Sequence, residues 1–214
     1  AVLAALAHAA YASRHSRVEV ESDLHHNIVP RPARLKPDGN KLVERAQVLK
    51  GTRYKVLASE DLVLHAMVHL MFDSDLVEKL RDLVDIDDMC RHFAGVYSKF
   101  WDRLLARAAE QGLERPLYYS LRYGQQLVDT PVPEKVDARV RRWAPVAPVK
   151  WLMDWCVPLA LLPEHPDYAR RGATMARLLL YMRSHWLRMP PWLLVYHLAY
   201  KSYIIQFRGG GHSA

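Results

Sequence analysis

The stretch "SEDLVLHAMVHLMF", residues 59–72, decides the fold class of this chain. It opens with a serine and two acids and continues with apolar residues at helical spacing, which is typical of the start of an amphipathic α-helix. From Ser59 onward the sequence keeps to helical patterns, with prolines and glycines between the segments. The sequence therefore predicts a mostly helical protein.

Further helices are predicted along the rest of the chain. Gly112 is expected to end one helix, Pro116 to lie in the first turn of the next, and Pro158 to kink or end a third. The expected segments are residues 75–92, 98–112, 114–129, a short helix within 130–143, 147–163, 166–187 and 191–206.

The first sixty residues have a different pattern. Residues 17–28 alternate and carry β-branched side chains, which predicts a strand, and a second short strand is expected near 52–57. Residues 41–49 are predicted to form a short helix. We therefore expect an α+β fold that is mostly α, with a small N-terminal β-containing region (1–57), a helical region (58–206) and a flexible tail (207–214).

Composition limits the class of protein. The 214 residues are 50% hydrophobic, which is enough for a folded core, and the formal net charge of +7 suits a partner that carries phosphate. The two cysteines, Cys90 and Cys156, form no disulfide framework, so we expect a reducing cytoplasm. No apolar run reaches the roughly 18–20 residues of a membrane span.

The first candidate site lies in "VEVESDLHHNIVPRP", residues 18–32. On a strand, Glu19, Glu21, Asp23 and His25 would point to one face, because successive side chains alternate. Carboxylates on one face can hold Mg²⁺. The alternative is the polar solvent face of an edge strand.

The second candidate is the pair His65 and His69. Their i, i+4 spacing places both imidazoles on one helix face. A zinc-protease helix would need Glu after the first histidine, and Ala66 stands there. The pair either packs in the core or lines a site. A metal enzyme using His25, His65 and His69 is a further alternative.

The third candidate is Asp85-Ile86-Asp87. A pair of aspartates in this pattern clamps two metal ions only on a strand, whereas here the surroundings are helical, so i and i+2 diverge. These acids are expected to be solvated or paired with Arg81 or Arg91. A single inward-facing Asp85 is kept as a site candidate.

Residues 181–200 interleave basic and aromatic side chains. This pattern is typical of nucleic-acid or membrane-surface binding. It also fits a core helix whose arginines extend to solvent.

Four stretches together resemble the uncharacterised nucleotidyltransferase family of bacteria, within the polymerase-β-type superfamily. They are "VESDLHHNIVPR", "LASEDLVLHAMVHL", "LRDLVDIDDMCRHF" and "RSHWLRMPPWLLVYHL". Such proteins carry an Asp-x-Asp on one strand and a third acid on a neighbouring strand. The resemblance implies that the three acids bind Mg²⁺ and a nucleoside triphosphate, whose nucleoside monophosphate passes to an acceptor hydroxyl as pyrophosphate leaves.

The resemblance assigns roles to particular residues. Asp23 matches the third, metal-binding acid, His25 accompanies it as a catalytic candidate, and Glu21 is the substitute if the strand register slips by two. The positions of His65, His69 and Asp85 also match the family, as weaker candidates for binding the nucleotide.

This chain departs from the family in one respect. It has no Gly-Ser turn and no strand-borne Asp-x-Asp before Asp23. We therefore expect it to be a C-terminal portion that is inactive alone. The alternative is a non-catalytic helical module that binds a protein or a nucleic acid.

Overall fold

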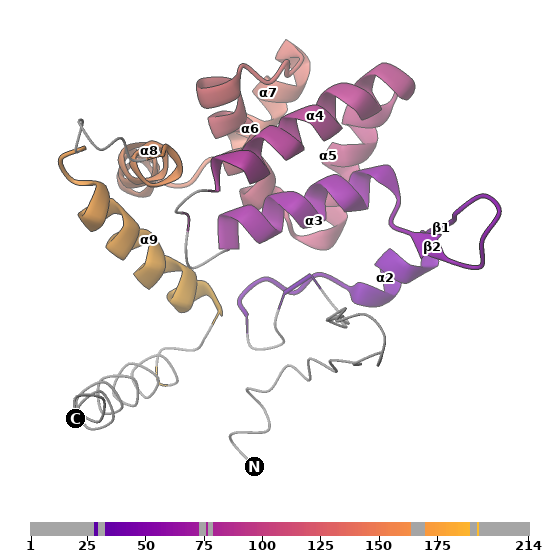
Figure 1. Cartoon of the computed structure of the whole chain (residues 1–214), viewed down its shortest axis with the longest axis horizontal. Coiled ribbons are helices and arrows are strands. Elements are labelled where there is room, and N and C mark those ends of the chain that lie inside the picture. The colour runs from indigo at the N-terminus through magenta and orange to yellow at the C-terminus, as the bar shows by residue number, and fades with distance from the viewer. Residues whose placement is uncertain are drawn as a thin grey trace, which may run out of the picture.

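The computed structural model describes residues 28–29, 33–72, 76, 79–163, 170–188 and 192. Helices make up most of this part of the chain, together with one small antiparallel sheet (Figure 1), so the mostly helical expectation is confirmed. The strand expected near 17–28, the helix expected over 191–206 and the tail lie almost entirely outside the described residues.

Along the chain, the elements follow one another with short connections. They are α2 (Gly39–Glu44), β1 (Gln47–Val48), β2 (Lys55–Val56), α3 (Ser59–Phe72), α4 (Leu80–Val96), α5 (Phe100–Gln111), α6 (Glu114–Val128), α7 (Glu134–Val140), the 3₁₀ turn η1 (Arg141–Trp143), α8 (Ala147–Leu161) and α9 (Ala173–Arg188).

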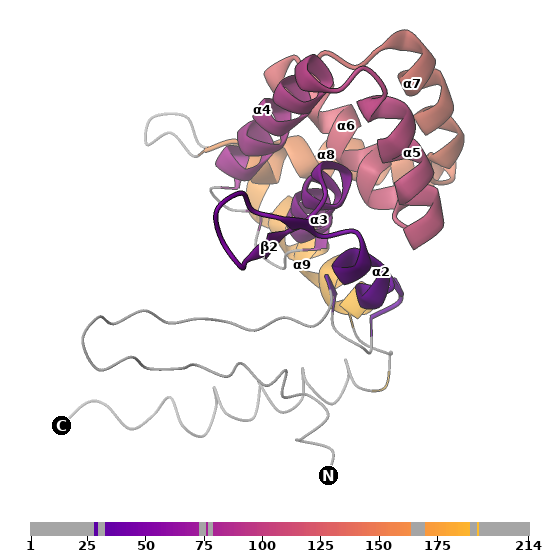
Figure 2. The same cartoon turned by 90° about the vertical axis from the view of Figure 1, so that its right-hand side faces the viewer.

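Helix α3 is the centre of the core. It packs against α4, α5 and α6, and its residues Val63, Leu64 and Met67 are fully buried. Helices α8 and α9 pack on each other beside this group, with α9 against α3 and α8 against α6 (Figures 1 and 2). The Nη1 of Arg183 donates to the Met71 carbonyl at 3.2 Å, which ties α9 to the end of α3.

The helix boundaries follow local chemistry. Gly112 ends α5 with φ +66°, a left-handed conformation that glycine adopts without strain, as predicted. Pro116 lies in the first turn of α6, also as predicted. Pro158 does not end α8, which continues to Leu161.

The helix expected over 41–49 is only half correct. Helix α2 ends at Glu44, and residues 47–48 instead form β1, which pairs with β2 in an antiparallel hairpin. Asp38 caps α2 by accepting a hydrogen bond from the Asn40 amide at 3.0 Å. The expected strand near 52–57 is confirmed at Lys55–Val56.

Candidate functional site

A buried ion pair connects α3 to α5. The Nε of Arg107 lies 2.5 Å from Oδ1 of Asp61, and its Nη2 lies 3.1 Å from Oδ2. Both side chains are about 1% exposed. The contact is therefore a two-pronged guanidinium–carboxylate pair removed from water, a geometry that fixes the relative orientation of its two helices.

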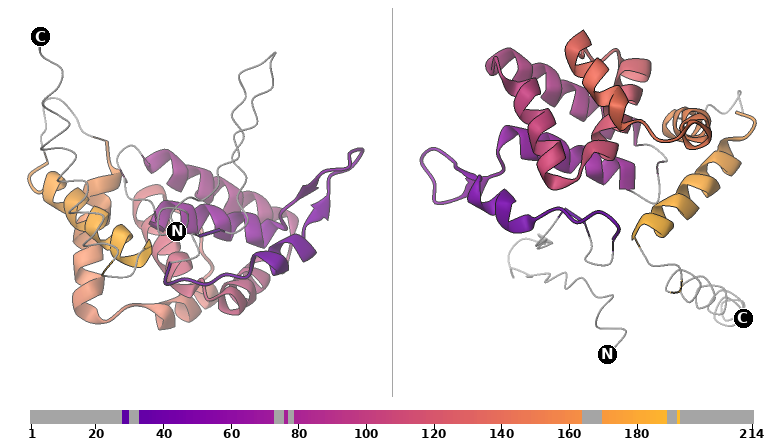
Figure 3. Two further views of the ribbon diagram at one scale, coloured as in Figure 1. Left: turned by 90° about the horizontal axis from the view of Figure 1, so that it is seen from below. Right: turned by 180° about the vertical axis from the view of Figure 1, so that it is seen from behind.

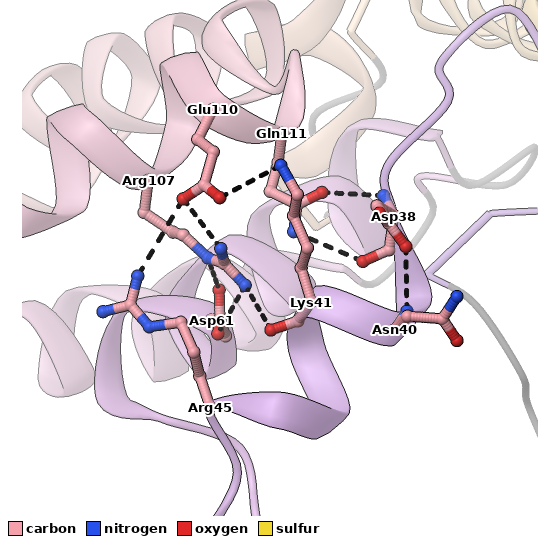
Figure 4. A network of polar contacts seen from close by, with 8 residues as sticks. All are labelled: Asp38, Asn40, Lys41, Arg45, Asp61, Arg107, Glu110 and Gln111. Carbon is pink, nitrogen blue, oxygen red and sulfur yellow. Dashed lines mark hydrogen bonds and ion pairs between the residues drawn. The ribbon is translucent and has the colours of Figure 1, made fainter.

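Neighbouring groups extend this pair to the N-terminal segment (Figure 4). Arg107 also donates to Glu110 at 2.8 Å and to the Lys41 carbonyl at 2.9 Å. The carboxamide of Gln111 accepts from the Asp38 amide at 2.7 Å and donates to its carbonyl at 3.3 Å. The network therefore fastens α2 to the helical core.

The electrostatics keep this network ionised. Burial by itself would lower the pKa of Arg107, but its hydrogen bonds to Asp61 and Glu110 raise it overall. Hydrogen bonds from Arg107 and Lys41 lower the pKa of Glu110. With both hydrogen-bonding edges of its guanidinium occupied, Arg107 has a structural role, and we assign it no part in catalysis.

Sequence reasoning missed Arg107, and it placed Asp61 in the first turn of a helix, one turn before His65, without predicting its buried pairing. A signal was present for Asp61, because it stands three residues before the buried Leu64 and seven before the buried Val68. It therefore shares the buried face of α3. Arg107 gave a comparable signal, because it stands three residues after the buried Leu104 and seven after the buried Phe100.

The structure brings His65 and His69 together on α3. Their ring centroids are 6.0 Å apart and the ring planes are tilted by 38°. His65 is half-buried and His69 is exposed, so the expectation that both pack in the core is wrong. The alternative that this pair of histidines lines a site stays a prediction.

The prediction of an inward-facing Asp85 as a site candidate is wrong. Asp85 is exposed on α4, and the buried carboxylate of this segment is Asp87. Asp87 accepts a hydrogen bond from Nε of Arg91 at 2.7 Å, which is the pairing predicted for these acids. The helical surroundings of Asp85-Ile86-Asp87 are also confirmed, so the two aspartates form no metal pair.

Asp23, His25 and Glu21 lie outside the described residues. Within the residues that are described, no group of three or more His, Cys, Asp or Glu side chains could hold a metal ion. None of the described helices has both the length and the apolar character of a membrane span.

A pocket of about 380 Å³ opens between α6 and the α7–η1 segment. Its charged side chains are already engaged: Arg122 with Asp154 at 2.6 Å, and Arg141 with Asp137 at 2.6 Å. The lining residues are Tyr118, Leu121, Arg122, Gln125, Gln126, Val132, Asp137, Val140 and Arg141. Sequence reasoning singled out none of these residues.

Comparison with known families gives the class of this protein. A family model described as uncharacterised nucleotidyltransferase matches residues 4–129, more than half of the 214 residues. The chain therefore belongs to this nucleotidyltransferase family. The match ends with α6, so α7, η1, α8 and α9 lie beyond it. Neither the curated proteins nor the solved structures contain a match to this chain.

Proposed function

We propose that this chain is part of an enzyme that transfers a nucleoside monophosphate from a nucleoside triphosphate to an acceptor hydroxyl. The observation that carries the proposal is the family match, which includes the acid-x-His stretch around Asp23 and His25. Nucleotidyltransferases use a triphosphate substrate and a divalent metal ion. Asp23 is our candidate for the third metal-binding carboxylate.

The described structure supports a positioning role for the helical body. Six residues after Asp23, Val29 is 4% exposed and belongs to the main hydrophobic core, as does Ala33 at 1%. Next in the chain, Arg34 donates its backbone amide to the Leu187 carbonyl at 2.9 Å, and its Nε donates to the Trp186 carbonyl at 3.1 Å. The acid-x-His stretch therefore leads directly into a segment anchored on α9.

In the proposed reaction, Mg²⁺ supplies charge neutralisation at the triphosphate. The carboxylate of Asp23 would help to hold the cation, together with a strand-borne Asp-x-Asp pair, which does not occur before Asp23 in this sequence. The acceptor oxygen forms a bond to the α-phosphorus while the bond to the pyrophosphate oxygen breaks. The acceptor's proton passes to a base, for which His25 is the nearest candidate in the sequence.

Weaker candidates remain for contacts to the nucleotide. His69 and Asp85 are exposed on α3 and α4, and His65 is half-buried on α3. Glu21 is the substitute for Asp23 if the strand register differs by two. We propose that residues 1–57 are part of the catalytic region. Residues 58–206 would form one wall of the cleft that binds the acceptor.

The DNA sequence upstream of Ala1 tests this proposal. We expect an in-frame Gly-Ser turn followed by an Asp-x-Asp with the alternation of a strand. A start codon directly before Ala1 would overturn the proposal and favour a non-catalytic module.

A further inference from the structure

The β1–β2 hairpin projects from the helical body as an isolated two-stranded ribbon (Figures 1 and 3). Both residues of each strand are exposed, so neither face of the ribbon is buried against the rest of the described chain. A two-stranded hairpin is only marginally stable in water without a packing partner. Both faces of the ribbon are therefore accessible to a binding partner.

The turn of this hairpin is built by local sequence. The Leu49 carbonyl accepts from the Thr52 amide at 3.0 Å, and Gly51 between them has φ +76°. This conformation suits glycine at the third position of a type II turn. The turn places Lys50 and Arg53 at the tip, the point farthest along the ribbon.

Three exposed apolar side chains of the ribbon share one face, while Val48, 65% exposed, lies on the other face with Lys55. The register pairs Gln47 with Val56, and the Leu49 amide donates to the Tyr54 carbonyl at 2.9 Å, so these four residues share a face. Tyr54 is 65% exposed, Leu49 47% and Val56 46%. We call this face the aromatic platform; it comprises Gln47, Leu49, Tyr54 and Val56.

The ribbon is also uniformly basic. Between Arg45 and Ser59 the sequence has four cations, Arg45, Lys50, Arg53 and Lys55, and no acid. Arg45 lies 4.0 Å from Glu110, but Lys50, Arg53 and Lys55 form no ion pair with any carboxylate in the described part of the chain. Lys55 pairs with Val48 on the face opposite the platform, whereas Lys50 and Arg53 lie at the tip beside it. An exposed apolar platform with unpaired cations at its tip complements a polyanion that also carries flat apolar groups.

We propose that the β1–β2 ribbon binds a single-stranded polynucleotide, with bases on the aromatic platform and phosphates at the tip, at Lys50 and Arg53. Single-stranded nucleic acid is bound in this manner by basic grooves that carry stacking aromatic side chains. An anionic membrane fits less well, because inserting the tip would carry Lys50 and Arg53 in first. The inference does not depend on the nucleotidyl-transfer proposal.

The test is fluorescence anisotropy of the whole chain with labelled oligo(U) and oligo(dT) of about twelve nucleotides. We expect saturable binding at about 50 mM salt that weakens as salt rises. The two oligonucleotides distinguish RNA from DNA, and stronger binding of either one supports the proposal. Absence of saturable binding to both would overturn it.

Variants locate the surface. Lys50→Gln with Arg53→Gln is expected to weaken binding about tenfold or more and to reduce the slope of log affinity against log salt by about 1.4, the value for two lost phosphate contacts. Tyr54→Ala should weaken binding roughly tenfold, whereas Tyr54→Phe should retain it, because the stacking ring remains. These side chains are exposed, so the circular dichroism of each variant should match that of the parent.

The matched control removes the same charge elsewhere. Lys135→Gln with Arg142→Gln changes two exposed cations on α7 and η1 and is expected to leave affinity within about twofold. An equal loss in this control would refute the ribbon as the binding surface. Binding to vesicles of phosphatidylserine and phosphatidylcholine, with no binding to either oligonucleotide, would assign the ribbon to a membrane surface instead.

Discussion

The Nε of Arg107 lies 2.5 Å from Oδ1 of Asp61, and both side chains are about 1% exposed. This pair joins α5 to α3, and the Lys41 carbonyl and Glu110 complete the hydrogen bonding of the guanidinium. A buried charge left without its partner is costly, whereas an intact pair contributes mainly to orientation. The stability of the helical core should therefore depend on both members being present.

Arg107→Met tests that dependence. The variant leaves the Asp61 carboxylate buried without its cation, so the free energy of unfolding should fall by about 3–5 kcal/mol in urea titrations. Arg139→Met is the control, because Arg139 and Asp102 are 3.6 Å apart and 56% and 78% exposed. It should cost less than about 1 kcal/mol. Equal effects of the two substitutions would contradict the structural role given to Arg107.

The lowered pKa of Asp154 predicts that the free energy of unfolding depends on pH. Burial by itself would raise its pKa, but hydrogen bonds donated by Arg122 and Lys150 lower it below the usual 3.8. The folded-state pKa is thus depressed, so the stabilisation is present above pH 3.8 and is lost as pH falls through the depressed value. Asp154→Asn should lower the free energy of unfolding by about 1–2 kcal/mol near pH 7, and this difference should shrink toward zero near about pH 2.

Asp102→Asn serves as the comparison for the pH experiment. Its side chain is 78% exposed and lies 3.6 Å from Arg139. The unfolding free energies of this variant and the parent should differ little at either pH. A difference for Asp154→Asn that stays constant across the acid range would show that the carboxylate's charge does not contribute.

The two cysteines should be chemically inert in the folded chain. Burial, together with the negative charge of Asp87, raises the pKa of Cys90 to about 12, and burial raises the pKa of Cys156. Neither thiol should react with a disulfide reagent near about pH 8, because the thiolate is the reactive form. Both should react after unfolding in guanidinium. Rapid labelling of either thiol in the folded chain would contradict the buried placement.

The backbone of Gly124, near the end of α6, lies too close to the Thr130 side chain to leave room for a Cβ. A Cβ there would lie 2.6 Å from Oγ1 of Thr130, whereas a Cβ at Gly95 would meet nothing within 4 Å. Gly124→Ala should lower the free energy of unfolding by about 1–3 kcal/mol, since the core would be overpacked. Adding Thr130→Ala should restore part of the loss. Gly95→Ala, within α4, should instead be neutral or stabilising by up to about 1 kcal/mol in the same urea titrations.

Local chemistry made the helices and several of their boundaries predictable. Gly112 and Pro116 act through the backbone angles that they permit, and those constraints are independent of distant partners. Strand β1 was missed because two residues, Gln47 and Val48, are too short to give an alternating pattern. The hairpin register depends on the turn at Gly51; sequence reasoning expected a turn before the second strand but did not pair that strand with residues 47–48.

The orientation of buried charges was harder to predict. On α4, Leu83, Ile86 and Cys90 form the buried face, and Asp87 stands four residues after Leu83 on that face. Asp85 was kept as a single inward-facing carboxylate without this spacing being applied to choose between Asp85 and Asp87. Arg107 stands on the buried face of α5, seven residues after Phe100, but its partner Asp61, forty-six residues away, could not be found from local pattern.

The central claim is that Asp23 belongs to a nucleotidyltransferase site, and pyrophosphate release tests it most directly. With Mg²⁺ and each of the four nucleoside triphosphates, the 214-residue chain alone should release no pyrophosphate. The product of the whole open reading frame should release it in the presence of its acceptor, lose that activity on Asp23→Asn and retain it on Glu19→Gln. Turnover by this chain alone, or activity of the whole product that persists after Asp23→Asn, would contradict the account.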